Sequence, residues 1–262
     1  MSKEQAKYLK KKKKEKLIVL FIQVIIITSF FVLWEYLSNN NYINSFIFSS
    51  PSKIVTTITG LISSNNLFSH IITTIYEVVI AFVLGIVLSF IIALILYEFP
   101  LIAKIVDPFL TMLNSLPKVA LGPLIIIIVG ANTKSIITMA LLINLIVTMM
   151  SIYNGFLNTD EYKIKLLKSF KASKKDILTK LVIPNSYETI ISSLKINISM
   201  TMIGVIMGEF LVSKKGLGYL IIYGTQVFNL SMVMGGILIL IILSYIMYLL
   251  VGYIEKILIK NN

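Results

Sequence analysis

Long apolar runs separated by short polar stretches dominate this chain. A helix needs about 20 apolar residues to cross the hydrocarbon core of a bilayer, and five runs reach that length: residues 17–37, 72–96, 136–156, 190–212 and 232–253. A sixth run, residues 105–129, is apolar but interrupted by Pro117 and Pro123. The alternating pattern of membrane β-strands is absent from the sequence. The pattern therefore predicts an all-α polytopic membrane protein with six transmembrane helices.

The interrupted run is the first candidate for function. Pro117 and Pro123 each remove a backbone donor and disfavour helix at the preceding residue. At membrane depth such a break is tolerated only where protein or a water-lined path satisfies the freed carbonyl groups. Pro117 and the neighbouring Lys118 are therefore candidate pore or gate residues, although Lys118 can equally extend to a lipid head-group region.

Composition agrees with a membrane protein and excludes several kinds of site. The chain is 57% hydrophobic and 14% charged, whereas soluble domains carry about a quarter charged residues. There is no cysteine, which excludes disulfides and thiolate metal sites, and a single histidine, His70, cannot form a histidine cluster. We expect no metal site. The net charge of +12 is explained by membrane topology, so we expect no nucleic-acid partner.

The lysines predict the topology. Residues 1–16 hold eight lysines and are expected to form a disordered cytoplasmic tail, followed by the first transmembrane helix at residues 17–37. With both termini in the cytoplasm, 18 lysines lie in inner segments and four in outer ones, as the positive-inside rule requires. This topology places residues 160–184 in the cytoplasm and residues 213–231 in an outer loop.

Residues 160–184 form the one long polar segment between apolar spans, with seven lysines and three acids. The pattern predicts two short helices. The first turns Ile164, Leu167 and Phe170 to one face, and the second starts with Ser173 as N-cap and Asp176 three residues later and stops at Pro184. The basic first turn of the second helix opposes the helix dipole. An acidic partner or lipid head groups would offset that charge, and an ordinary basic loop remains an alternative.

This segment resembles the conserved cytoplasmic loop of ABC-importer permeases, which reads Glu-Ala-Ala, then Gly about four residues later, then Ile/Leu-Pro. Alignment places Glu-Ala-Ala on Lys165, Leu166 and Leu167, and the glycine on Lys171, so these four positions depart from the pattern. Ala172, Ser173, Ile183 and Pro184 keep it. The resemblance implies that these residues, together with Ile177, couple the chain to an ATPase.

Three further stretches carry the same resemblance. They are Ser50-Pro51-Ser52, Leu116-Pro117-Lys118-Val119-Ala120 with Pro123 and Gly130, and Glu209 followed by Gly216-Leu217-Gly218-Tyr219. The similar region covers residues 50–255. Within the family, the chain is most similar to the nitrate, sulfonate, taurine and bicarbonate subgroup, which includes carriers of thiamine-precursor pyrimidines.

The resemblance implies a type I ABC importer permease, with a peripheral first helix and a five-helix core, in a bacterial cell membrane. It implies two ATPase subunits, an extracytoplasmic solute-binding protein and a second permease copy, in a homodimer, as partners. ATP would be hydrolysed on the ATPase, because this chain lacks a phosphate-binding glycine loop with its lysine. We therefore expect no enzymatic activity and no cofactor on this chain. The implied cargo is a small solute, either a sulfonate-, nitrate- or taurine-like anion or a thiamine-precursor-like compound.

Polar side chains within the spans are further candidates, because they are unfavourable in lipid unless they have a function or a partner. Asn144 and Asn197 either line the translocation path or form hydrogen bonds between helices. Glu209 either contacts the substrate or pairs with Lys214, Lys215 or the backbone. Two other functions remain as alternatives, a secondary transporter, which predicts two related halves, and a membrane scaffold that does not transport.

Overall fold

The computed structural model describes residues 3–63 and 66–260, and every regular element in these residues is a helix. Five helices are long and apolar enough to cross a membrane. They are α1 (Lys3–Asn39), α4 (Asn66–Glu98), α7 (Thr133–Leu157), α11 (Tyr187–Val212) and α13 (Leu230–Lys260). The interrupted run forms a bent pair of helical segments, which brings the number to six if the pair is one span. The predicted all-α fold is therefore confirmed, with five to six helices that can cross a membrane.

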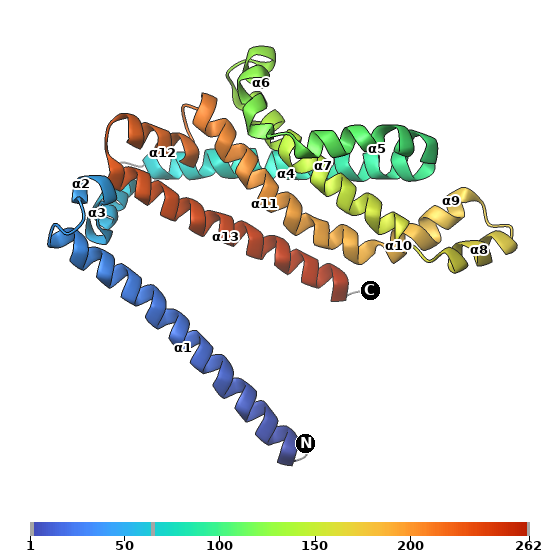
Figure 1. The fold of residues 1–262 in the computed structure, drawn as a ribbon, viewed down its shortest axis with the longest axis horizontal. Coiled ribbons are helices and arrows are strands. Elements are labelled where there is room, and N and C mark those ends of the chain that lie inside the picture. Colours follow the sequence, from blue (N-terminus) through green and yellow to red (C-terminus); the bar gives the residue numbers. More distant parts are fainter. Residues whose placement is uncertain (1–2, 64–65, 261–262) are drawn as a thin grey trace.

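Helices α4, α7 and α11 form the centre of the bundle, and α13 packs along α11 (Figure 1). Small residues bring α7 and α11 together, as expected for helices that associate in lipid. A side chain at Gly204 would meet the backbone of Ala140, and one at Gly208 would lie 2.9 Å from the Cα atom of Ile136. The glycine spacing on α11 therefore sets how closely the two central helices approach.

The bent span consists of α5 (Pro100–Ser115), the 3₁₀ turn η1 (Lys118–Leu121) and α6 (Gly122–Val129). Its two halves meet at an angle of 89°. The break lies at the predicted Leu116-Pro117 position, where Leu116 adopts an extended conformation. Figure 1 shows α5 lying beside the central helices while α6 turns away from them.

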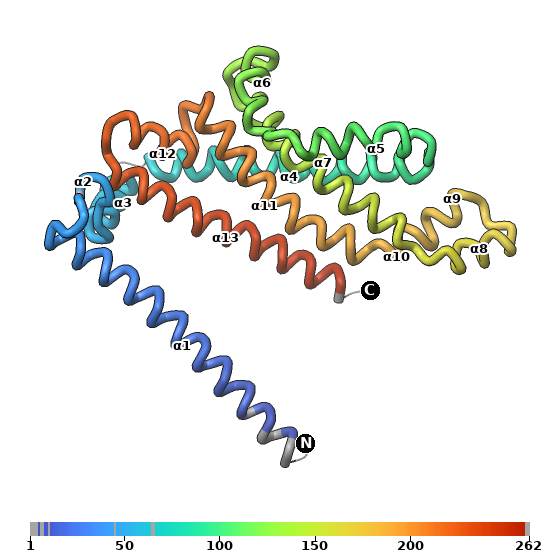
Figure 2. Tube along the Cα trace, in the orientation of Figure 1, coloured from blue at the N-terminus to red at the C-terminus, as the bar shows by residue number. Residues whose placement is uncertain are grey.

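Helix α1 is peripheral, as predicted, but it starts earlier than expected. Its apolar window is 0% buried, and Figure 2 shows it diverging from the bundle. Ser38 Oγ donates to the carbonyl of Ser49 at 2.8 Å, and Ser52 Oγ donates to Glu35 at 2.8 Å, which ties the end of α1 to the segment around α2 (Ser45–Phe48) and α3 (Pro51–Ser63). The expected disordered tail differs from the structure, because the helix runs back to Lys3. Lysine has a good helix propensity and extends the apolar helix without a break.

The expected outer loop at residues 213–231 contains a helix, α12 (Leu217–Gln226). Gly216 precedes it with a φ of +111°, a conformation that favours glycine. Leu217, Leu220 and Ile221 are buried, and the first two pack in a cluster with Leu67 of α4 and Leu243 of α13. This i, i+3, i+4 spacing is helical, so the glycine-rich motif begins a packed helix, where we expected an irregular loop.

Residues 160–184 fold as predicted up to their end. Helix α8 (Glu161–Ser169) is followed by α9 (Lys174–Ile177), a π-helical turn η2 (Leu178–Val182) and α10 (Ile183–Asn185). The prediction that Pro184 ends the second helix is wrong. Pro184 lies in the first turn of α10, where its missing N–H needs no partner, and the wide π turn before it gives its ring room.

Candidate functional site

The segment Asp160–Pro184 is built on specific local caps. Asp160 begins α8 by accepting a hydrogen bond from the N–H of Tyr162 at 2.8 Å. Ser173 and Asp176 form the predicted capping box of α9, because Ser173 Oγ accepts from the N–H of Asp176 at 3.1 Å and Asp176 accepts from the N–H of Ser173 at 3.3 Å. The turn between the helices is therefore held by side chains that belong to it.

Lys171, at the family's glycine position, adopts a φ of +61°. Left-handed backbone is unfavourable for residues with a Cβ atom and is the usual reason for a glycine at the end of a helix. The N–H of Lys171 donates to the carbonyl of Lys168 at 2.9 Å. Lys171 thus keeps the backbone shape that a glycine would adopt there.

One face of the segment packs on the ends of α4, α5 and α7. Ile177 is buried, and Ile164, Leu167, Ala172 and Ile183 are partly buried against the same cluster. The cluster core contains Ala93, Leu96, Ala103, Met149, Ile152, Phe156, Ile177 and Val182. The segment therefore shares one apolar cluster with the ends of three helices.

The opposite face carries exposed apolar side chains. Tyr162, Leu166 and Phe170 are 81%, 55% and 73% exposed, and their i, i+4, i+8 spacing places them on one helical stripe. We call these three residues the docking stripe. Phe170 was expected beside Ile164 and Leu167, but it is 73% exposed whereas they are partly buried. Sequence reasoning selected Leu166 and missed Tyr162, although the spacing itself was visible.

The remaining coupling candidates lie on the surface. Lys165, Lys171, Ser173 and Pro184 are exposed. The ammonium group of Lys165 lies 3.4 Å from the carboxylate of Glu161 and 5.6 Å from the centre of the Tyr162 ring. Exposed pairs of this kind contribute little to stability, so Lys165 is free to change partners.

Asp176 is the acid that balances the basic start of α9. Its hydrogen bond with Lys180, followed by those with the hydroxyl and N–H of Ser173, lowers the pKa of Asp176 to about 2. Lys180 Nζ lies 2.6 Å from Asp176 Oδ1. The carboxylate is therefore charged at physiological pH and placed favourably near the start of the helix.

Lys118 lies at the break in the bent span. Its ammonium group donates to the carbonyl and to the side-chain oxygen of Asn114, at 3.3 and 3.2 Å. A cation at the end of α5 complements the free carbonyl groups there. Pro117 is exposed beside it. The break thus places a half-buried positive charge next to an exposed proline, and a charged side chain is unfavourable in contact with lipid.

Asn144 and Asn197 lie in the middle of the bundle and are completely buried. Asn144 Nδ2 donates to Thr201 Oγ1 at 2.6 Å, Thr201 donates to Asn197 Oδ1 at 3.2 Å, and Asn197 Nδ2 donates to Thr148 at 3.1 Å. Gly85 of α4 leaves the room that Asn144 fills. Of the two alternatives for these asparagines, hydrogen bonding between helices is the one that the single chain displays.

Glu209 lies near the end of α11 that is opposite to α8, and it is 1% exposed. It accepts hydrogen bonds from Thr74 Oγ1 at 2.6 Å and from the N–H of Gly218 at 2.5 Å. Neither Lys214 nor Lys215 forms an ion pair with it in the described part of the chain. The backbone alternative for Glu209 is therefore the one observed.

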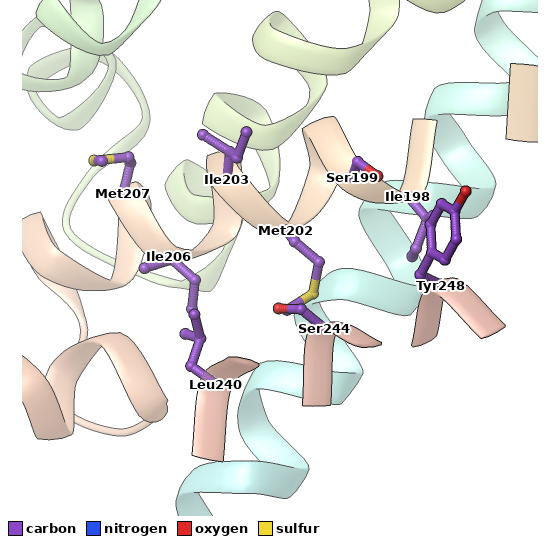
Figure 3. A pocket seen from close by; sticks show the side chains of 9 residues that line it. All are labelled: Ile198, Ser199, Met202, Ile203, Ile206, Met207, Leu240, Ser244 and Tyr248. Carbon is purple, nitrogen blue, oxygen red and sulfur yellow. The ribbon is translucent and has the colours of Figure 1, made fainter. Parts of the chain in front are cut away.

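A shallow cavity of about 350 Å³ lies between α11 and α13 (Figure 3). Met202 and Ile206 of α11 face Ser244 and Leu240 of α13 across it. Its lining is almost entirely apolar and carries no charged side chain. None of the pore candidates predicted from the sequence lines this cavity, so it does not unite them into one site.

Comparison with known proteins gives these positions a context. A family model described as the binding-protein-dependent transport system inner membrane component matches residues 85–260. An aliphatic sulfonates transport permease protein SsuC of Bacillus subtilis is 23% identical over 87% of this chain and 83% of its own length. The formylaminopyrimidine transport permease protein ThiX of Halalkalibacterium halodurans is 25% identical over 72% of this chain and 74% of its own length.

The fold has a match among solved structures. A chain from an inward-facing structure of the MetNI methionine ABC transporter superposes with a TM-score of 0.65 and 17% sequence identity. The match covers 73% of this chain and 95% of that chain.

Proposed function

This chain belongs to the binding-protein-dependent transport system inner membrane component family, and on that premise we propose how it works as the permease subunit of an ATP-driven importer. The segment Asp160–Pro184 receives an ATPase subunit, and the helices it packs against carry the resulting movement into the bundle. The observation that carries this proposal is the division of the segment into an exposed docking stripe and a face packed on α4, α5 and α7.

The docking stripe has the chemistry of a protein contact. Three large apolar side chains that are more than half exposed form a patch that favours burial against a partner. Lysines surround it on α8, at Lys163, Lys165 and Lys168, so the complementary surface carries acidic groups. ATP acts on that partner subunit, and this chain supplies no residue to its hydrolysis.

The bent span supports a path between two permease copies. Lys118 and the backbone around Pro117 lie at the surface of one chain, where lipid would leave polar groups unsatisfied. A second copy of this chain would cover that surface and enclose water around it. Alternation of the path between its two sides is a two-state equilibrium that the ATPase shifts through its contacts with the docking stripe.

The orientation follows the lysine distribution. The end of the bundle with α8 and α9 carries most lysines and would face the cytoplasm, with both chain termini on that side. The opposite end, with α3 and α12, would then face an extracytoplasmic solute-binding protein that delivers the cargo. The charge of Lys118 favours a small anion such as a sulfonate, the class named for the Bacillus subtilis relative.

The docking stripe gives a direct test. In the importer purified through a tag on this chain, Leu166→Asp and Phe170→Asp should release the copurifying ATPase and abolish ATP-driven uptake into vesicles. Leu157→Asp is the matched control, because Leu157 is also 55% exposed but lies on α7, outside the docking stripe. If the two stripe variants retain the ATPase and the uptake rate, the proposed contact is wrong.

A further inference from the structure

A buried pair of acids lies at the end of the bundle that is opposite to α8. Glu77 of α4 and Glu209 of α11 are each 1% exposed. Thr74, one helical turn before Glu77 on α4, donates to Glu209 Oε1 at 2.6 Å, which brings the two acids side by side. Oxygen Oε2 of Glu77 is fully buried and has no hydrogen-bond partner. Two carboxyl groups in contact and away from water require an explanation, because buried charges are normally paired with opposite ones.

Glu209 is surrounded by donors. Its two oxygens accept from Thr74 Oγ1 and from the N–H of Gly218. Gly216 and Gly218 wrap closely around it, since a Cβ atom on either would collide with the Glu209 side chain. Donors of this kind stabilise the ionised form of a carboxyl group, so Glu209 is the anionic member of the pair.

Glu77 must then supply the hydrogen. A hydrogen bond between two carboxyl groups needs one of them to be protonated, and two like charges in contact in a buried site cannot both form. No lysine forms an ion pair with either acid among the described residues. We propose that Glu77 and Glu209 form a proton-binding site, in which Glu77 holds one proton and donates it to Glu209.

Other titratable groups on the surrounding elements do not offer this function. His70 of α4 accepts the N–H of Gly216 on Nδ1 at 3.0 Å and stacks on Tyr219 of α12, so its acceptor nitrogen is already used. The nearby lysines are Lys214 and Lys215 in the turn before α12 and Lys134 in the first turn of α7. None of these three lysines replaces the proton as a counter-charge.

The site holds three helices together. Thr74 accepts the N–H of Leu217 at 2.9 Å while donating to Glu209, so α4, α11 and α12 meet at one point. Loss of the proton places two negative charges in contact and separates α4 from the other two helices. The three helices therefore stay in contact at neutral pH and separate as the pH rises. This inference goes beyond the proposed coupling to an ATPase.

The test uses the full chain in lipid nanodiscs. Infrared spectra should contain the C=O band of a buried protonated carboxyl group, which disappears in Glu77→Gln and on raising the pH. The melting temperature of the native chain should fall at alkaline pH, whereas Glu77→Gln, whose amide still donates to Glu209, should lose this shift. Glu209→Gln should melt lower at every pH, because an amide nitrogen cannot accept the N–H of Gly218.

The same experiment can overturn the proposal. A native spectrum without the band, or an alkaline shift that is unchanged in Glu77→Gln, would exclude a shared proton. Stabilisation of the alkaline form by added Na⁺ or Ca²⁺ would assign the pair to a cation in its place. None of these readouts depends on transport, so the proton site and the permease function can fail separately.

Discussion

The N–H of Ala172 donates to the carbonyl of Leu167 at 3.0 Å, across the end of helix α8. Together with the bond from Lys171 to Lys168, it forms the paired arrangement known as a Schellman motif. The motif requires a left-handed backbone at the residue that donates the inner of the two bonds, which here is Lys171. The same turn follows Phe170 of the docking stripe and leads into Ala172 of the packed face, so its shape positions both.

Replacing Lys171 with glycine should stabilise this turn. Left-handed backbone is unfavourable for a residue with a Cβ atom by about 1–2 kcal/mol, and the greater flexibility of glycine in the unfolded chain offsets about 0.5–1 kcal/mol of the gain. Hydrogen exchange at the amides of Lys171 and Ala172 should therefore slow several-fold in Lys171→Gly. The measurement is native-state exchange on the full chain in nanodiscs.

The matched control is the same substitution in ordinary helix. Lys165→Gly, in the middle of α8, should destabilise that helix by about 1 kcal/mol and speed exchange of its amides. Faster exchange in both variants would mean that the backbone of Lys171 is not strained.

The sequence predicted the position of this turn but not the reason for it. The family resemblance aligned Lys171 with a glycine, so this position was described as a departure from the family pattern. The left-handed backbone instead shows that the local shape is retained despite the substitution. Backbone angles depend on hydrogen bonds between residues 167 and 172, which a single-residue comparison does not reveal.

Acid should loosen the start of α9. The pKa of Asp176 is lowered from 3.8 to about 2, so its contribution to stability is present above about pH 4 and is lost as the pH falls through about 2. The amides of Ser173 and Asp176 should then exchange faster at the acid end of this range, relative to the intrinsic rate. Asp176→Asn should remove the pH dependence, and a variant that keeps it would assign the effect to another group.

Other features of the site depended on contacts that are distant in sequence. Glu209 was predicted to be important, but its partners Thr74 and Gly218 come from different helices. Glu77, the acid that we propose shares a proton with it, is 132 residues away along the chain. The length of each apolar run predicts a span, because most of each helix surface faces lipid or other apolar side chains. Which side chains of two helices face each other depends on how the helices pack, and the apolar pattern does not determine this. The residues that meet inside the bundle therefore became clear only in the structure.

The buried asparagine network should couple α7 to α11 measurably. Asn144→Ala, Thr201→Ala and the double variant form a mutant cycle in which the interaction between the two side chains should measure about 0.6 kcal/mol, the average for such bonds in membrane helices. Unfolding in detergent by a denaturant gives the three free energies. A coupling of zero would contradict the 2.6 Å hydrogen bond between them.

The close approach of α7 and α11 should make Gly204 intolerant of even a methyl group. The Cβ atom of Gly204→Ala would meet the backbone of Ala140, which cannot rotate away, so the helices must separate. Overpacking of this kind lowers stability by about 1–3 kcal/mol. Gly60→Ala is the matched control, because no atom lies within 4 Å of the added methyl group on α3, and there the loss of backbone flexibility should stabilise the protein by about 0.5–1 kcal/mol. Opposite signs in melting temperature for the two variants are expected, and equal shifts would mean that Gly204 does not lie at the helix contact.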